Sequence, residues 1–126
     1  FIDGVFIADS KETAKTDYAG ALNTVVISDA DSESAAAACK NYAFPNGKNG
    51  YLAAAGEWSV VNRNRSNINS ALTLIGGTSF PTNVKYCSST QYGEITIWTW
   101  QFSTSADGIS YDWKSNSQRV RAFTTL

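Results

Sequence analysis

Residues 86–102, YCSSTQYGEITIWTWQF, place five aromatic side chains in one short run, interleaved with Ser, Thr, Gln and Glu. Alternation of large apolar and small polar residues is typical of a β-strand, because successive side chains point to opposite faces. We therefore expect the even-numbered aromatics to face the core and the polar residues between them to point outward: Trp98, Trp100 and Phe102 inward, and Thr99, Gln101 and Ser103 outward.

Ile95 and Ile97 interrupt this pattern because they share the face opposite to Trp98. One side of a strand cannot bury both sets without an extra residue in the ladder. We therefore expect a β-bulge or a strand start near Ile97 and Trp98.

The remaining periodicity predicts an α+β organisation in a single domain, residues 1–126. We expect strands at 4–9 and 23–28, helices within 29–42, 50–65 and 67–77, and strands at 85–90, 95–104, 108–113 and 118–126. Asp31 or Ser32 is expected to cap the first helix. Its apolar stripe is expected to face the core and comprises Ala35, Ala38, Cys39 and Tyr42. Gly76 is a natural stop for the third helix, and Asp107-Gly108 marks a turn. The abrupt start at FIDGVFIAD is what a domain excised from a longer protein would show.

Composition disfavours several classes of function. A net charge of −1 gives no basic stripe for nucleic acid. The chain contains no histidine, which removes the commonest general base, the usual Ser-His-Asp relay and most transition-metal sites. No apolar run approaches the roughly 18 residues that cross a bilayer. We therefore expect no cofactor, no nucleic-acid partner and no direct membrane insertion.

The two cysteines, Cys39 and Cys87, are too few for a structural zinc site. They could form one disulfide, or they could remain two buried thiols, because Cys behaves as a small hydrophobe. The sequence leaves both alternatives open.

Five blocks carry a resemblance to a known family: NGYLAAAGEW, NINSALTLIGGTSF, YCSSTQY, IWTWQF and KSNSQRVRAF. In this order they resemble the C-type-lectin-like ligand-binding domains, and among these the variable proteins of diversity-generating retroelements, which occur in phage receptor-binding fibres and on bacterial surfaces. The similarity extends over residues 33–126, and the closing RVRAFTTL is its most specific part.

The resemblance implies a C-type-lectin-like fold in which the N- and C-terminal strands pair and two to three helices flank a small, mainly antiparallel sheet. The chain departs from the pattern of this family in three places, which affect local packing and one edge of the expected binding face. Ala53 stands where the family commonly has proline, Cys87 stands where it has tryptophan, and residues 103–108 form a longer hairpin than usual.

The resemblance also implies a non-enzymatic domain that displays a variable surface on the C-terminal sheet. Carried over position by position, the ligand-binding residues would be Tyr86, Glu94, Ile95, Thr96, Thr99, Gln101, Ser103, Ser110, Asp112, Trp113, Asn116 and Gln118. Framework positions would be Trp98, Trp100, Phe102, Arg119, Val120, Arg121 and Phe123. Tyr and Trp add contact area at low entropic cost, and Ser, Thr, Asn and Gln supply adaptable hydrogen bonds.

Three other functional hypotheses are weaker. Calcium lectins of this fold show Glu-Pro-Asn or Gln-Pro-Asp with Trp-Asn-Asp, whereas this chain has Phe44 before Pro45 and YDW at 111–113. A glycosidase needs two paired carboxylates, and no spacing singles out such a pair. Arg119 and Arg121 could suggest an anion site, but packing of their stems over a sheet edge or an aromatic ring is the simpler interpretation.

The partner implied by the resemblance is a protein or glycan on a host or neighbouring cell, and the location is a phage fibre tip or a bacterial cell surface. The parent protein could add homo-oligomerisation, which multiplies weak single sites. The alternative hypothesis is a structural module whose same face packs on a neighbouring domain.

Overall fold

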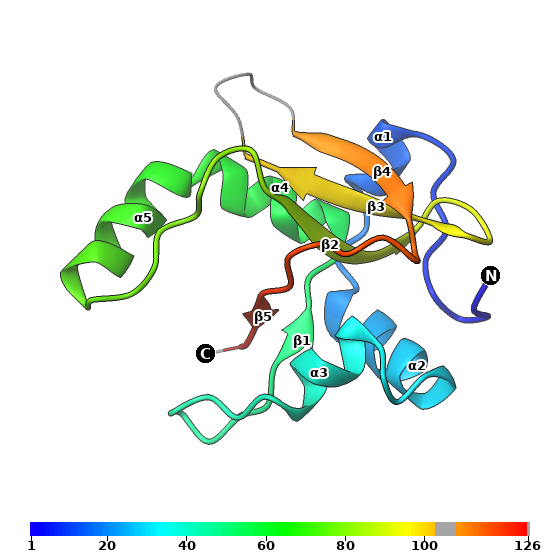
Figure 1. The fold of residues 1–126 in the computed structure, drawn as a ribbon, viewed down its shortest axis with the longest axis horizontal. Helices are drawn as coiled ribbons and strands as arrows, with labels where there is room; N and C mark the ends of the chain where they lie inside the picture. Colours follow the sequence, from blue (N-terminus) through cyan, green and yellow to red (C-terminus); the bar gives the residue numbers. More distant parts are fainter. Residues whose placement is uncertain (103–107, 126) are drawn as a thin grey trace.

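The computed structural model describes residues 1–102 and 108–125, which form two small antiparallel sheets flanked by helices (Figure 1). The larger sheet has the order β2-β3-β4, with β2 Lys85–Gln91, β3 Thr96–Gln101 and β4 Ile109–Trp113. The smaller sheet pairs β1 Tyr51–Leu52 with β5 Ala122–Phe123. The five helices of the described residues are α1 Lys11–Ala14, α2 Gly20–Ala30, α3 Ala35–Asn41, α4 Ala55–Arg63 and α5 Arg65–Leu74. The α+β class is confirmed, although the helices outnumber the two or three expected.

The strand expected at 23–28 is wrong, because this segment lies inside α2. The buried positions of α2 follow a helical spacing and are Gly20, Asn23, Thr24 and Ile27. Two of these are polar, so Ile27 alone gives the buried stripe an apolar signal. Burial of this stripe overrides the local strand preference of Thr-Val-Val-Ile.

The strand expected at 4–9 is also absent, and only Ile7 forms an isolated parallel bridge, with Gln91 of β2. The expected pairing of N- and C-terminal strands is therefore wrong, since β5 pairs with β1 in the middle of the chain. The N-terminal segment is held instead by the buried Gln91. Its amide nitrogen donates to Ile2 O at 3.0 Å, and its amide oxygen accepts from Ile2 N–H at 2.9 Å.

The helix expected in 29–42 exists but begins at Ala35, where Ser34 acts as the cap through a 3.1 Å bond from Ala37 N–H to its hydroxyl. Asp31 instead accepts from Glu33 N–H in the turn that precedes the helix. The buried residues of α3 are Ala36, Ala37 and Cys39, so the stripe expected to face the core is rotated and Tyr42 is exposed. The stop of α5 is confirmed, because Gly76 has a φ of +73°.

Separate cores cover the two faces of the larger sheet. One joins Trp98 and Trp100 to Trp58 of α4, together with Tyr86 and Phe102. The other joins residues of β2 and β3 to α2, α3 and β1, and includes Ile27, Cys39, Leu52, Cys87 and Ile97. The inward orientation of Trp98, Trp100 and Phe102 is confirmed. Ile97 is buried as well, because its own face also carries a core.

The expected irregularity near Ile97 and Trp98 is present, but the extra residues lie in β2. Cys87 pairs with Thr99 and Gln91 pairs with Ile97, so residues 88–90 face Trp98 alone. Ser88 stabilises this bulge because its hydroxyl donates to Trp98 O at 2.7 Å and accepts from Thr90 N–H at 3.2 Å.

A buried polar cluster around Asp17 ties this bulge to the helices. Its carboxylate accepts from the Asn23 amide at 2.9 Å, from the Thr90 hydroxyl at 2.8 Å and from Ala19 N–H at 2.9 Å. The Thr90 hydroxyl in turn accepts from Ala55 N–H at 2.9 Å, at the start of α4. These buried hydrogen bonds link α2, α4 and β2 to one another.

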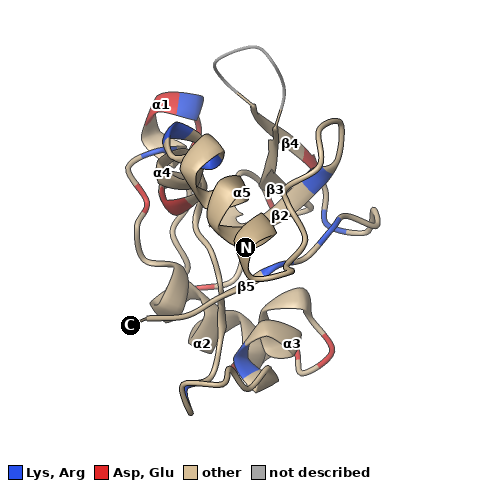
Figure 2. Ribbon diagram, turned by 90° about the vertical axis from the view of Figure 1, so that its left-hand side faces the viewer, with Lys and Arg blue, Asp and Glu red and all other residues tan. Residues whose placement is uncertain are grey.

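Basic and acidic residues are spread over several elements rather than gathered on one face (Figure 2). Among the described residues, no helix combines the length and apolar character that crossing a bilayer requires.

Candidate ligand-binding face

The strand register divides the expected ligand residues between two faces of the sheet. Thr96 pairs with Trp113, Trp98 with Tyr111 and Trp100 with Ile109, so these six residues share one face, here called the aromatic face. Ile97 pairs with Asp112, Thr99 with Ser110 and Lys85 with Gln101, which defines the opposite, polar face. Asp112 and Trp113 therefore cannot contact one ligand from the same face of β4.

Two expected surface residues are buried. Tyr86 is 4% exposed and packs on Trp58 with ring centroids 4.9 Å apart, so it belongs to the core. Thr99 is 1% exposed, and its hydroxyl has no hydrogen-bond partner among the residues that the structure describes. The expectation that these two side chains point into solvent is wrong. Ser103, another expected surface residue, lies outside the described residues.

Thr99 is covered because the chain returns across the polar face after β4. Arg119 N–H donates to Lys85 O at 2.9 Å, and Cys87 N–H donates to Arg119 O at 2.9 Å, so residue 119 lies at the far edge of β2. Residues 114–118 must therefore cross the sheet, and Figure 1 shows this segment passing between the larger sheet and α3. We call residues 114–119 the crossing segment.

Asp112 links the crossing segment to the sheet. Its carboxylate accepts from the Asn116 amide at 2.7 Å, from Trp113 N–H at 2.8 Å and from the Lys85 ammonium at 3.2 Å. These donors hold the pKa of the Asp112 carboxyl below its usual range, with the Trp113 backbone bond as the largest cause. Gln118 donates to Trp113 O at 3.3 Å. Asp112, Asn116 and Gln118 thus hold the chain in place, whereas Gln101 and Ser110 are half-buried on the same face.

The outer end of the aromatic face carries an exposed cluster. Tyr111 is 51% exposed and Trp113 is 52% exposed, two residues apart on β4. Tyr92 stacks on Tyr111 with centroids 4.5 Å apart and on Trp98 with centroids 4.9 Å apart. Trp98 is itself fixed by a 3.0 Å bond from its indole N–H to Ala8 O. We call Tyr92, Tyr111 and Trp113 the aromatic patch.

Three expected residues border this patch at the β2–β3 turn. Glu94 and Ile95 are exposed, with Ile95 at 60%, and Thr96 is half-buried beside Trp113. The turn is rigidly placed because Lys114 N–H donates to Ile95 O at 2.8 Å. The patch and this turn therefore form one continuous surface at the end of the sheet.

Tyr111 was missed by the sequence-based prediction. A signal was present, since Tyr111 and Trp113 are separated by two residues and must point to the same side of a strand. The register then places them beside Trp98, which the sequence already assigned to the aromatic face.

The arginine prediction is confirmed at Arg121. Its guanidinium lies 4.3 Å from the centroid of the Phe80 ring and donates to Thr78 O at 3.1 Å. This contact is a cation–π interaction that packs the terminal strand onto the core. Arg121 is therefore occupied by structural contacts.

Two ionisable groups at β1 and at the start of α4 have raised pKa values. Burial raises the pKa of the Glu57 carboxyl, against the opposing bond from Ala54 N–H at 2.7 Å. Burial and the neighbouring Glu57 raise the pKa of Tyr51 to about 12. Glu57 thus stabilises the start of α4, where it lies in the first turn.

Both thiols are free and buried in the structure. Burial raises the pKa of Cys39 to about 11 and, together with the neighbouring Cys39, raises that of Cys87 to about 12. At neutral pH both are therefore protonated and behave as apolar core groups.

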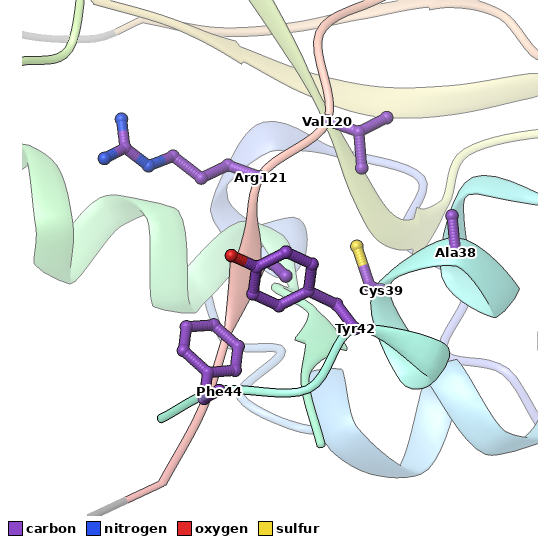
Figure 3. A pocket seen from close by; sticks show the side chains of 7 residues that line it. Ala38, Cys39, Tyr42, Phe44, Val120 and Arg121 are labelled. Carbon is purple, nitrogen blue, oxygen red and sulfur yellow. The ribbon is translucent and has the colours of Figure 1, made fainter. Parts of the chain in front are cut away.

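A cavity of about 440 Å³ lies between α3 and the terminal strand, and Figure 3 shows its lining. Tyr42 and Phe44 form an edge-to-face pair with centroids 4.9 Å apart, and Val120 and Cys39 line the other side. In Figure 3 the guanidinium of Arg121 points away from these rings. The cavity is therefore an aromatic hollow with no charged group directed into it among the residues drawn.

Comparison of the chain with protein-family models, with curated proteins and with solved structures gave no match.

Proposed function

We propose that this domain is a non-enzymatic ligand-binding module with a C-type-lectin-like fold. The aromatic patch, with Glu94, Ile95 and Thr96, is the contact surface. The ligand is a protein or glycan on another cell, and the setting is a phage fibre tip or a bacterial surface protein. The proposal rests on one observation, namely that Tyr111 and Trp113 are half exposed while the next aromatics of the same face are fully buried.

This arrangement suits recognition because two of its rings, Tyr92 and Tyr111, already pack against each other before a ligand binds. Tyr92 is held between Trp98 and Tyr111, and Trp98 is fixed by its bond to Ala8. A preorganised aromatic surface loses little conformational entropy on binding, and a few such anchors carry most of the affinity of an interface. A planar ring can also stack on the apolar face of a sugar without a metal ion.

The test measures binding of the domain, multimerised on a carrier, to a glycan array and to a panel of bacterial cells. Tyr111→Ala and Trp113→Ala should each weaken binding about thirtyfold, as loss of an anchor worth about 2 kcal/mol does. Leu74→Ala is the matched control, because Leu74 is 87% exposed on α5, away from the patch. Equal binding by all three variants would contradict the proposal.

The alternative is a structural module in which a neighbouring domain covers the same surface. The exposed Ile95 fits this alternative equally well, because apolar side chains at an interface core are desolvated. Hydrogen exchange of the parent protein separates the two. Protection of the amides at 94–96 and 111–113 in the parent, relative to the isolated domain, would favour the structural module.

A further inference from the structure

A second cavity lies on the polar face of the sheet, opposite the aromatic patch. It measures about 340 Å³ and reaches the core that contains Ile97 and Cys87. Its floor is apolar and is formed by Ile27, Ala36, Leu52, Cys87 and Ile97. Each of these floor residues is at most 8% exposed, so an apolar group placed here would meet a preformed surface.

The rim of this cavity carries charges of both signs. Asp31 and Glu33 lie on the side formed by the turn between α2 and α3, and Lys114 lies on the side formed by the crossing segment. No ion pair between Lys114 and either carboxylate is present in the described parts of the chain. The nearby Lys40 is directed elsewhere, since its ammonium contacts Asp29 at 3.4 Å and the Ser28 hydroxyl at 3.1 Å.

Each rim group retains capacity for a ligand. Asp31 uses one carboxylate oxygen to accept from Glu33 N–H at 2.9 Å, and the Glu33 carboxylate has no partner among the described residues. Lys114 donates one hydrogen bond, to the Gln91 amide oxygen at 3.1 Å, and an ammonium has three donors. Partial burial of its ammonium lowers the pKa of Lys114.

We propose that this cavity binds a short zwitterionic peptide with an apolar side chain. The side chain rests on the floor, the peptide ammonium lies beside Asp31 and Glu33, and the peptide carboxylate lies beside Lys114. The acidic residues and Lys114 belong to different segments that line the cavity, and a dipeptide likewise carries its two charges at separate ends. The volume is at the low end of the range of about 300–1,000 Å³ for ligand sites, as suits such a ligand.

The probe for the test is the dipeptide Leu-Leu, titrated into the domain by calorimetry and followed by NMR shifts at Ala35 and Lys114. N-acetyl-Leu-Leu lacks the ammonium, and Leu-Leu-amide lacks the carboxylate. Each blocked form should bind about fivefold more weakly or worse, because it loses a charge-assisted contact at a partly exposed rim.

Paired variants assign each end of the probe to its partner. Glu33→Gln should weaken binding of Leu-Leu but leave binding of N-acetyl-Leu-Leu unchanged. Lys114→Gln should likewise weaken binding of Leu-Leu and leave binding of Leu-Leu-amide unchanged. Glu12→Gln and Lys11→Gln on α1 make the same charge changes away from the cavity and should alter none of these affinities.

Ala35→Phe tests whether the cavity itself is the binding site, and it removes no core side chain. Ala35 is half-buried at the cavity wall, in the first turn of α3. The added ring should occupy the cavity and abolish binding while the melting temperature stays within a few degrees. Absence of Leu-Leu binding by the wild-type domain would overturn the proposal. So would equal binding of the blocked and unblocked peptides, or unchanged binding by a folded Ala35→Phe variant. None of these outcomes bears on the aromatic patch, whose test uses other variants and other ligands.

Discussion

Replacement of Thr99 by valine should stabilise the domain. Thr99 is 1% exposed in the middle of β3, and within residues 1–102 and 108–125 its hydroxyl has no hydrogen-bond partner. A buried polar group without a partner costs about 1–3 kcal/mol relative to one that is satisfied. Valine keeps the β-branched shape and removes the hydroxyl, so the free energy of unfolding should rise by about 1 kcal/mol.

Thr90 is a matched control on the neighbouring strand. It is 0% exposed, and its hydroxyl both accepts from Ala55 N–H at 2.9 Å and donates to the Asp17 carboxylate at 2.8 Å. The same change to valine leaves a buried N–H without an acceptor and removes a donor from a buried carboxylate. Thr90→Val should therefore lose about 3 kcal/mol or more.

Urea unfolding, followed by tryptophan fluorescence, measures the stability of both variants. The comparison requires that the slope of the unfolding free energy against urea concentration stay unchanged. In a separate thermal melt, the midpoint temperature of Thr99→Val should rise by about 3–5 °C for a chain of this length. A loss of stability in Thr99→Val would show that its hydroxyl is hydrogen-bonded in solution and would refute the reasoning. A similar loss of stability in Thr99→Val and Thr90→Val would also refute the reasoning. Ligand binding should be unaffected, because Thr99 does not reach the surface.

Three further outcomes are expected. Trp100→Ala should lose about 3–5 kcal/mol of stability in a thermal melt, whereas Trp113→Ala should change the stability by less than about 0.5 kcal/mol. The reverse order would mean that Trp113 is the buried residue and Trp100 the exposed one. Cys39 and Cys87 should resist iodoacetamide in the native protein at pH 7 and react at once in urea, as mass spectrometry would show, because their raised pKa values and burial keep the thiolates scarce. Since the native state holds the Glu57 proton more tightly than the unfolded chain does, stability should fall as the pH rises from the usual glutamate pKa through the raised native pKa. In urea melts run from pH 4 to 8, Glu57→Gln should remove this fall in stability. An unchanged pH dependence in the variant would contradict the raised pKa of Glu57.

The sequence predicted those parts of the fold that local residue patterns determine. The strand period of residues 96–101 and the helix before Gly76 follow directly from local patterns, and both are present. The error at α2 has a specific cause. Its buried side includes Asn23 and Thr24, whose polar atoms are satisfied by Asp17 and by the backbone of Gly20 and Leu52. A periodicity of apolar residues cannot reveal a helix whose buried side is partly polar.

The error at Thr99 has a different origin, because its environment depends on residues far along the chain. Alternation assigns Thr99 correctly to the face opposite Trp98 and Trp100. Alternation does not say whether that face is open, and the crossing segment that covers it is placed by the bonds of Arg119 to the far edge of β2. The position of such a segment follows from long-range pairing, which no local pattern contains.

A sheet covered on both faces can present an open contact surface where its cover ends, and one such place is the outer end of β4. Along the aromatic face of β4 the exposed fraction rises from 2% at Ile109 to 51% at Tyr111 and 52% at Trp113. Substitutions at the last two positions thus change the surface without opening a cavity, whereas a substitution at Thr99 must repack a core. If this domain does vary its ligand, the variation that it tolerates most readily is therefore at Tyr111, Trp113 and the adjoining turn at 94–96. A library randomised there should yield mostly folded variants, and one randomised at Thr99 and Tyr86 should not.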